Sequence, residues 1–153
     1  MDASEAMRVN RALNKMSKLY RAVKARKLAE LGLHPGQDVL LWLLAQEREG
    51  MTVSELAARI GIEPPTATRS LARLENSGWF RREAVATDRR QVRIVVTDAG
   101  HELVPAIERV WAELAEQTMG GTSDEQREIV LAALEQANDR LRGDVGEAVL
   151  AEE

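Results

Sequence analysis

Hydrophobic residues recur at helical spacing near both ends of the chain. Across residues 4–31 they are separated alternately by four and three positions, at Val9, Leu13, Met16, Tyr20 and Val23. Two later stripes run through Leu103, Ile107, Val110 and Leu114, and through Val130, Leu134, Ala137 and Leu141. This spacing gathers apolar side chains on one side of a helix. The pattern predicts three long amphipathic helices, one before and two after a central region, with caps at Thr97 or Asp98 and at Thr122 or Ser123.

Shorter elements are predicted in the central region. A helix through Val39 and Leu44 is apolar on most sides, so we expect it at the buried centre of the fold. A short helix capped by Ser54 follows, and after a turn at Gly61 a second helix begins with Pro64 and Pro65. Residues 79–83 and 91–97 are strand-like around a polar turn at 86–90, and in the second segment Val92, Ile94 and Val96 alternate with polar Arg93. The order predicts a mostly α protein with a small β-hairpin wing, a winged helix-turn-helix between terminal helices.

Charge is distributed unevenly along the chain. Residues 64–93 hold seven arginines and three acids, a local charge of +4. Because the net charge of the whole chain is −4, the remaining residues carry a charge of −8. A local cationic segment favours a nucleic-acid partner more than the net charge opposes one. A solvated surface with chance clustering is the simpler alternative.

The second short helix has two different faces on a helical wheel. Ala67, Leu71 and Leu74 fall within one arc and are expected to face the core. The opposite arc holds Pro65, Arg69, Ala72, Arg73 and Asn76, and it is flanked by Thr66, Thr68 and Ser70. Small, hydroxyl and cationic residues of this kind suit close approach to base edges and phosphates. This face predicts a recognition helix for the major groove. At the hairpin tip, Asp88 lies beside Arg89 and Arg90, and arginine is drawn into narrow minor grooves.

Together these motifs resemble the multiple antibiotic resistance regulator (MarR) family of winged helix-turn-helix transcriptional regulators. The likeness covers nearly the whole chain and is carried by SELA at 54–57, TATR at 66–69, LARLENSG at 71–78, DRR at 88–90 and VTDAG at 96–100. It departs at Trp79-Phe80, where the family usually has smaller aliphatic residues. We expect these two rings to pack at the base of the hairpin.

The resemblance implies a division of the chain and a set of contacts. Residues 1–153 form a single MarR-like domain, with the winged helix-turn-helix module at 34–100 and a helical dimerisation region at 1–33 and 101–153. Thr66, Thr68 and Arg69 take recognition-helix positions that contact DNA, and Asp88 with Arg90 matches the acid-and-arginine pair of the wing. Double-stranded DNA is the predicted partner, and the remaining candidate contacts are Ser54, Pro65, Arg73 and Arg89.

The terminal stripes predict a homodimer, because one small winged module cannot bury them all. A two-fold dimer sets two recognition helices about 34 Å apart on a near-palindromic operator. A monomer that packs these stripes internally is the alternative. Members of the family usually act as repressors, and in many relatives a small aromatic or phenolic ligand relieves the repression. Candidate residues for such an effector site are Tyr20, Arg21, His34, Trp42 and Trp111, although their rings also suit an ordinary core.

Several classes of function find no support in the sequence. The chain has no cysteine, which removes disulfides and thiol-based redox sensing. His34 and His101 stand alone, so we predict no metal and no cofactor. No nucleophile elbow or phosphate loop is present, and we expect no catalytic residues and no enzyme. The longest apolar run is too short for a membrane span and the N-terminus is polar, which predicts a cytoplasmic protein. A winged-helix module that binds another protein, without an operator, is the alternative function.

Overall fold

A computed structural model describes residues 1–75, 77–85 and 88–145, with the side chains of residues 73, 75, 85, 88–91 and 142–145 outside that description. The described elements, in order, are α1 (Ala3–Ala29), α2 (Gln37–Ala45), β1 (Met51–Thr52), α3 (Val53–Ile60), α4 (Pro64–Glu75), β2 (Phe80–Val85), β3 (Asp88–Val96), α5 (Asp98–Met119) and α6 (Asp124–Val145). This is the mostly helical fold with a small sheet that the sequence predicts.

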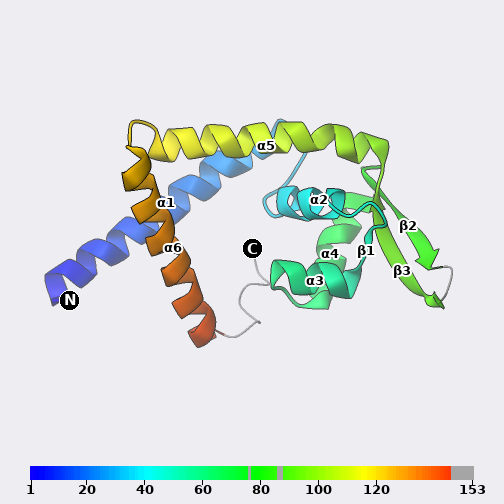
Figure 1. The fold of residues 1–153 in the computed structure, drawn as a ribbon, viewed down its shortest axis with the longest axis horizontal. Coiled ribbons are helices and arrows are strands. Elements are labelled where there is room, and N and C mark those ends of the chain that lie inside the picture. The colour runs from blue at the N-terminus through cyan, green and yellow to red at the C-terminus, as the bar shows by residue number, and fades with distance from the viewer. Residues whose placement is uncertain (76, 86–87, 146–153) are drawn as a thin grey trace.

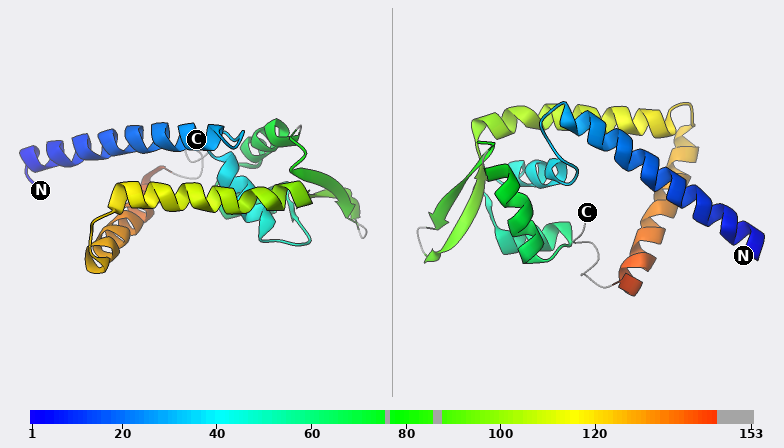
Figure 2. Two further views of the ribbon diagram at one scale, coloured as in Figure 1. Left: turned by 90° about the horizontal axis from the view of Figure 1, so that it is seen from above. Right: turned by 180° about the vertical axis from the view of Figure 1, so that it is seen from behind.

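The molecule has two parts that meet along α5 (Figure 1). One part holds the elements from α2 to β3 and is called the winged module. The other consists of α1, α5 and α6 and is called the helical arm. Helix α1 packs against α5, and α6 leaves the end of α5 farthest from the strands at a steep angle (Figure 2). In the described part of the chain, no helix combines the length and apolar character needed to cross a membrane.

Side-chain caps explain where several helices begin. Thr97 caps α5 by accepting a hydrogen bond from the Gly100 backbone N–H, and Ser123 caps α6 by accepting one from the N–H of Gln126. The prediction that Ser54 caps α3 is wrong. Thr52 is the N-cap, and it forms a reciprocal capping box with Glu55 three residues later. Ser54 is the second residue of the helix, because the chain enters α3 directly from a strand.

The sheet has three antiparallel strands in the order β1-β3-β2. The sequence predicted only the β2–β3 hairpin, because β1 has two residues and two residues show no alternation. In β1, Met51 pairs with Ile94 and Thr52 pairs with Arg93. At the base of the hairpin Phe80 is only 4% exposed and Trp79 packs against the same core, which confirms their predicted place.

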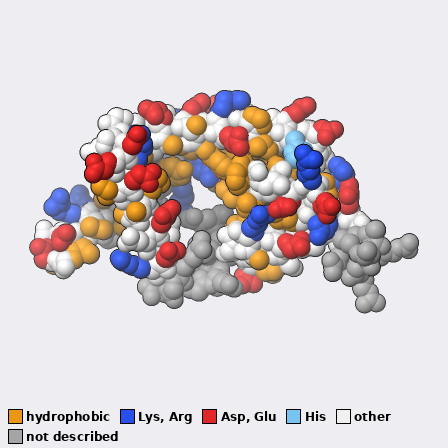
Figure 3. All heavy atoms as spheres, viewed as in Figure 1, with side chains coloured by type: hydrophobic (Ala, Val, Ile, Leu, Met, Phe, Trp, Pro, Cys, Tyr) orange, Lys and Arg blue, Asp and Glu red, His pale blue; other side chains and the backbone are white. Residues whose placement is uncertain are grey.

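One hydrophobic core joins the winged module to α5. Ala67, Leu71 and Leu74 of α4 are at most 1% exposed, as the helical wheel predicts. Ile107 and Leu114 of α5 are buried in the same core. In contrast, most of the apolar stripe on α1 and all the described large apolar residues of α6 are exposed, at Val9, Leu13, Met16, Tyr20, Ile129, Val130, Leu131, Leu134 and Leu141. Hydrophobic side chains gather along the inner edge of the arch formed by α5 and α6 (Figure 3).

A buried carboxylate ties the two parts of the molecule together. Asp38, near the start of α2, has no exposed surface. Its Oδ2 atom lies 2.9 Å from Lys24 Nζ of α1 and accepts a hydrogen bond of 2.7 Å from Trp111 Nε1 of α5. Its Oδ1 atom accepts from the Gly36 backbone N–H at 3.1 Å. Three helices and the turn before α2 therefore meet at one side chain.

Further polar contacts run beside this carboxylate. The rings of Trp42 and Trp111 lie 5.6 Å apart between centroids at an interplanar angle of 57°. Trp42 Nε1 donates to Glu108 on α5 at 3.0 Å. Lys27 of α1 pairs with Glu113 of α5, and that hydrogen bond and charge lower the pKa of Glu113. The interface between the winged module and the helical arm is therefore formed by polar contacts next to the hydrophobic core.

Replacement of the buried carboxylate is expected to destabilise the fold. Asp38→Ala leaves the Lys24 ammonium and the Trp111 N–H without their acceptor, and breaking a buried pair costs about 3 kcal/mol. Urea denaturation at one fixed protein concentration measures this loss. The matched control is Asp139→Ala on the exposed surface of α6, for which we expect a change below about 0.5 kcal/mol. Equal stability of Asp38→Ala and the parent protein would contradict the account of this interface.

Candidate nucleic-acid interface

Helix α4 presents a polar face to solvent because its apolar face is fixed in the core. Gly61 ends α3 in the left-handed region at φ 79°, and Pro64 begins α4. Proline suits this first turn because the missing N–H has no helical partner there. Pro65, Thr68 and Arg69 are exposed on the side opposite the buried Ala67. The face therefore combines a cation, a hydroxyl and small residues, the types that approach base edges and phosphates.

The predicted contact residues of α3 and α4 differ in their surroundings. Ser54 is exposed on α3. The Thr68 hydroxyl donates to the Pro64 carbonyl within its own helix at 2.9 Å, which leaves its oxygen able to accept. Thr66 is half-buried and lines a cavity between α4 and α1, so part of its surface faces away from the outward side. The Arg73 side chain lies outside the described residues.

The wing extends beyond α4 as a two-stranded hairpin. Its pairing runs from Phe80↔Val96 to Ala84↔Val92, and after an irregularity Val85 pairs with Asp88. Arg81 Nε lies 2.7 Å from Glu83 Oε1 on the same strand. The side chains of Asp88, Arg89 and Arg90 lie outside the described residues, so the predicted acid-and-arginine pair at the tip stays a prediction.

The base of the wing is fixed to the start of α5. Thr97 Oγ1 donates to the Gly78 carbonyl at 2.7 Å, and the Thr97 N–H donates to the Trp79 carbonyl at 2.9 Å. Gly100 allows this close approach, because a Cβ atom there would lie 2.2 Å from the Trp79 carbonyl oxygen. The wing and α5 are therefore joined at one end of the hairpin, and strands β2 and β3 extend from there away from the core (Figure 1).

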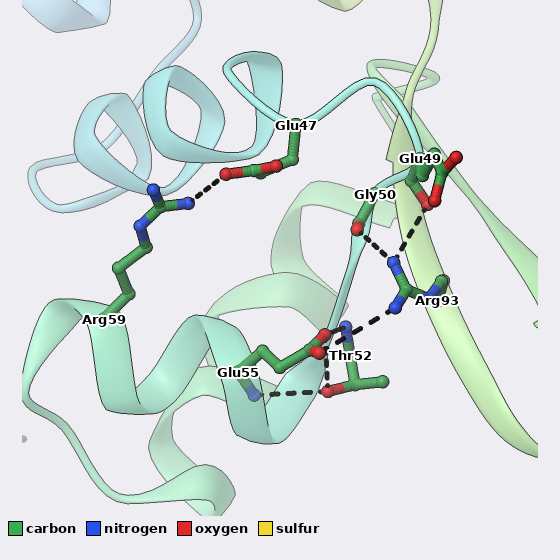
Figure 4. A network of polar contacts seen from close by, with 7 residues as sticks. All are labelled: Glu47, Glu49, Gly50, Thr52, Glu55, Arg59 and Arg93. Carbon is green, nitrogen blue, oxygen red and sulfur yellow. Dashed lines mark hydrogen bonds and ion pairs between the residues drawn. The ribbon is translucent and has the colours of Figure 1, made fainter.

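A network of charged groups lies between α3, the loop before β1 and strand β3 (Figure 4). The Glu55 carboxylate accepts hydrogen bonds from the Thr52 N–H at 2.8 Å and the Thr52 hydroxyl at 3.0 Å. These bonds are the main cause of the lowered pKa of Glu55; burial opposes them, and the Arg93 charge lowers the pKa by less than burial raises it. Arg93 reaches this network from β3. From the sequence, Arg93 was one of the seven arginines of the cationic segment and a polar residue in an alternating strand. Its contacts could not be predicted, because its partners lie about forty residues away along the chain.

The five residues predicted to border an effector site separate into two groups. Tyr20 and Arg21 line a cavity of about 410 Å³, together with Lys24 of α1, residues of α2 and α3, and Thr66 and Ser70 of α4. Of the described residues, those lining this cavity do not include His34, Trp42 or Trp111. The two tryptophans instead contact each other and α2 and α5 carboxylates. His34 is exposed in the turn before α2. Within the described ranges, no cluster of three or more His, Cys, Asp or Glu residues is placed to hold a metal ion.

Comparison with known proteins agrees with this architecture. The sequence profile of the MarR family matches residues 33–92, which run from the turn before α2 into β3. The transcriptional regulator PA3341 is 32% identical to this chain, and the match covers 88% of this chain and 98% of that one at a TM-score of 0.67. The solved structure of MarR itself is 27% identical over 88% of this chain and 93% of that one, with a TM-score of 0.70.

The chain belongs to the MarR family.

Another solved structure with the same fold is a complex with DNA. S. aureus MepR, solved with DNA, is 23% identical to this chain, with a TM-score of 0.75 and coverage of 92% of this chain and 98% of that one. At that identity the comparison establishes the shared fold. In this MarR-family member the fold places the exposed face of α4 and the wing on the same module, and the helical arm carries the exposed apolar residues of α1 and α6.

Proposed function

We propose that the protein is a sequence-specific regulator of transcription, acting as a repressor, that binds double-stranded DNA as a homodimer on a palindromic operator. The observation that carries the proposal is the exposed face of α4, where Thr68 and Arg69 lie opposite a buried apolar face. Family membership supports DNA binding and regulation, and MepR of the same fold was solved with DNA. Residues 1–153 act as one MarR-like domain in which residues 34–100 bind DNA and residues 1–33 and 101–153 dimerise.

Each part of the module has a proposed role. Arg69, with Thr66 and Thr68, reads base edges in the major groove, and Ser54 and Pro65 lie against the adjoining backbone. Arg90, oriented by Asp88, enters the minor groove at the wing tip. Arg73 and Arg89 neutralise phosphates. Affinity therefore falls steeply with salt, since each neutralised phosphate contributes close to one unit of log–log slope.

Two arginine variants separate base reading from groove binding. Arg90→Ala is expected to weaken binding to all sequences, whereas Arg69→Ala relaxes discrimination at one base step by about 1–3 kcal/mol. Gel shift or fluorescence anisotropy at 150 mM salt, with the DNA upstream of the protein's own gene and with mismatched sites, measures both effects. Equal binding by the parent protein and Arg90→Ala would refute the role of the wing. No binding to any DNA by the parent protein would favour a protein-interaction module instead.

The homodimer is proposed from the apolar surface that one protomer leaves exposed. Leu131 and Leu134 of α6 are 52% and 49% exposed, and they line an apolar groove of about 550 Å³ with Met119 of α5. Exposed apolar side chains gathered in this way mark an interface. Additional apolar residues of α1 extend the same type of surface along the helical arm.

Sedimentation is expected to give a species of about twice the 17.0 kDa chain mass at micromolar concentration. Leu134→Glu places a charge in the proposed interface and should shift the protein toward the monomer and weaken operator binding. Glu135→Gln on the same helix serves as the control and should leave the dimer intact. A parent protein that sediments only as a 17.0 kDa species would defeat the dimer.

A small aromatic or phenolic anion is proposed as the effector. The cavity beside Tyr20 and Arg21 has a volume in the range of small-molecule sites. It also touches Thr66 and Ser70 of α4, so a bound molecule would contact both the helical arm and the recognition helix. The Arg21 guanidinium, which bonds Ser17 Oγ at 3.2 Å, is a candidate for the carboxylate. The residues carried forward from the sequence prediction are thus Tyr20 and Arg21.

Salicylate and related phenolic acids are expected to raise the melting temperature and to release DNA. Arg21→Gln should reduce the shift by removing one of the two cations that line the cavity, while Trp42→Phe, away from the cavity lining, should keep it. Thermal unfolding with and without each acid measures the shift. An unchanged melting temperature with every acid, and no release of DNA, would count against this effector class.

A further inference from the structure

Arg93 makes a side-chain link from the wing to the helix-turn-helix. Its guanidinium extends from β3 across the loop before β1 (Figure 4). Nη1 donates to the Gly50 carbonyl at 2.8 Å and lies 3.5 Å from the Glu49 carbonyl, while Nη2 lies 3.8 Å from Glu55 Oε1. Only 33% of the Arg93 side chain is exposed. The guanidinium charge therefore faces groups of this protein on two sides.

This link supplements a very short strand pairing. Among the described residues, the wing is joined to β1 through two residue pairs, Met51↔Ile94 and Thr52↔Arg93. Gly50 brings the loop as close to β3 as the backbone allows: its φ is +70°, and a Cβ there would lie 2.3 Å from the Ile94 carbonyl oxygen. This approach places the Gly50 carbonyl within reach of Arg93. A two-residue ladder resists bending weakly, so a third contact from the side chain restricts the angle of the wing.

Glu55 connects the same link to the start of α3. Its Oε2 atom accepts the capping-box hydrogen bond from the Thr52 N–H and a further one from the Thr52 hydroxyl, while Oε1 faces Arg93. Helix α3 packs directly against α4. A chain of contacts therefore runs from the wing strand through Arg93 and Glu55 to the helix-turn-helix.

Arg93 and Glu55 line a cleft of about 650 Å³ whose lining also includes Glu47 and Arg59. The ion pair between Glu47 and Arg59 does not involve the wing. Arg59 Nη1 lies 2.5 Å from Glu47 Oε1 and joins α3 to the loop after α2. Both side chains are more than 40% exposed. This pair has the same chemistry in the same cleft, and so it provides a matched control.

We propose that Arg93 is a positioning residue that sets the angle between the wing and helices α3 and α4, so that wing tip and recognition helix engage one DNA segment together. The role rests on the proposed DNA-binding function. Arg93 acts through Arg90 and the other wing-tip groups. The positioning role of Arg93 depends on the fork geometry of its guanidinium, which lysine does not reproduce.

A double-mutant cycle tests the role in DNA binding. Arg93→Met is expected to weaken operator binding about tenfold, and Arg93→Lys, which keeps the charge, should restore little of the loss. In an Arg90→Ala background, Arg93→Met should add less than about twofold, because residues that act through one another are not additive. Losses that multiply in the double variant, together with rescue by Arg93→Lys, would show a separate phosphate contact and overturn the proposal.

Glu55→Gln and Glu47→Gln provide the matched pair of carboxylate variants. Glu55→Gln retains an acceptor for the capping box but removes the charge facing Arg93, so we expect about threefold weaker binding. Glu47→Gln removes a carboxylate from the same cleft and should change binding by less than about twofold. Equal effects of the two substitutions would overturn the proposal. Glu55→Gln also keeps the test decisive if Arg93→Met does not fold.

A measurement without DNA separates this proposal from the proposed function. The chain has no cysteine, so cysteines introduced at the exposed Ala58 of α3 and Ala84 of β2 accept spin labels specifically. The distance distribution between the labels, measured in protein diluted with unlabelled copies, should broaden or shift in Arg93→Met and remain unchanged in Glu47→Gln. An unchanged distribution in Arg93→Met overturns the positioning role, whether or not the protein binds DNA.

Discussion

The buried carboxylate of Asp38 is the constraint on which the relation between helical arm and winged module depends. A carboxylate without exposed surface is tolerated only when charged and hydrogen-bonded partners replace water. Here Lys24 of α1, Trp111 of α5 and the Gly36 N–H supply those partners. Because each partner comes from a different segment, a large displacement of any one leaves a buried charge incompletely paired. The two parts of the molecule are therefore held in one relative arrangement.

This arrangement gives the proposed regulation a physical basis. Lys24 binds Asp38 and also lines the cavity that contains Tyr20 and Arg21, and the opposite side of that cavity is formed by α4. An anion in the cavity would thus lie next to the cation that compensates the buried carboxylate, and next to the recognition helix. At the other end of the module, the wing is fixed by Thr97 and Gly100 to α5 and by Arg93 to the loop before β1. The position of both proposed DNA-contacting elements is set by contacts outside them.

Local periodicity was enough to predict much of this structure. The buried face of α4 was correct because side chains on a helix repeat every 3.6 residues whatever the rest of the fold does. Strand β1 was missed because two residues carry no period, and Ser54 was taken as the cap of α3 although the Thr52–Glu55 spacing is that of a capping box. Asp38 and Arg93 were missed for a different reason. Trp111 is 73 residues from Asp38 and Gly50 is 43 residues from Arg93, so these contacts are seen only in the fold. The acid in the apolar segment QDVLLWLLA was nevertheless a usable signal for Asp38. Trp42 and Trp111 were grouped with Tyr20 and Arg21 by residue type, and the fold separates them.

The central claim is that a symmetric dimer binds DNA with a recognition helix and a wing from each subunit. Hydroxyl-radical footprinting on an operator fragment tests this claim most directly. The account predicts protections related by two-fold symmetry, with the half-site centres about one helical turn, roughly 34 Å, apart and minor-groove protection beside each half-site. Protection confined to a single asymmetric half-site, or minor grooves that stay fully reactive in a saturated complex, would contradict it.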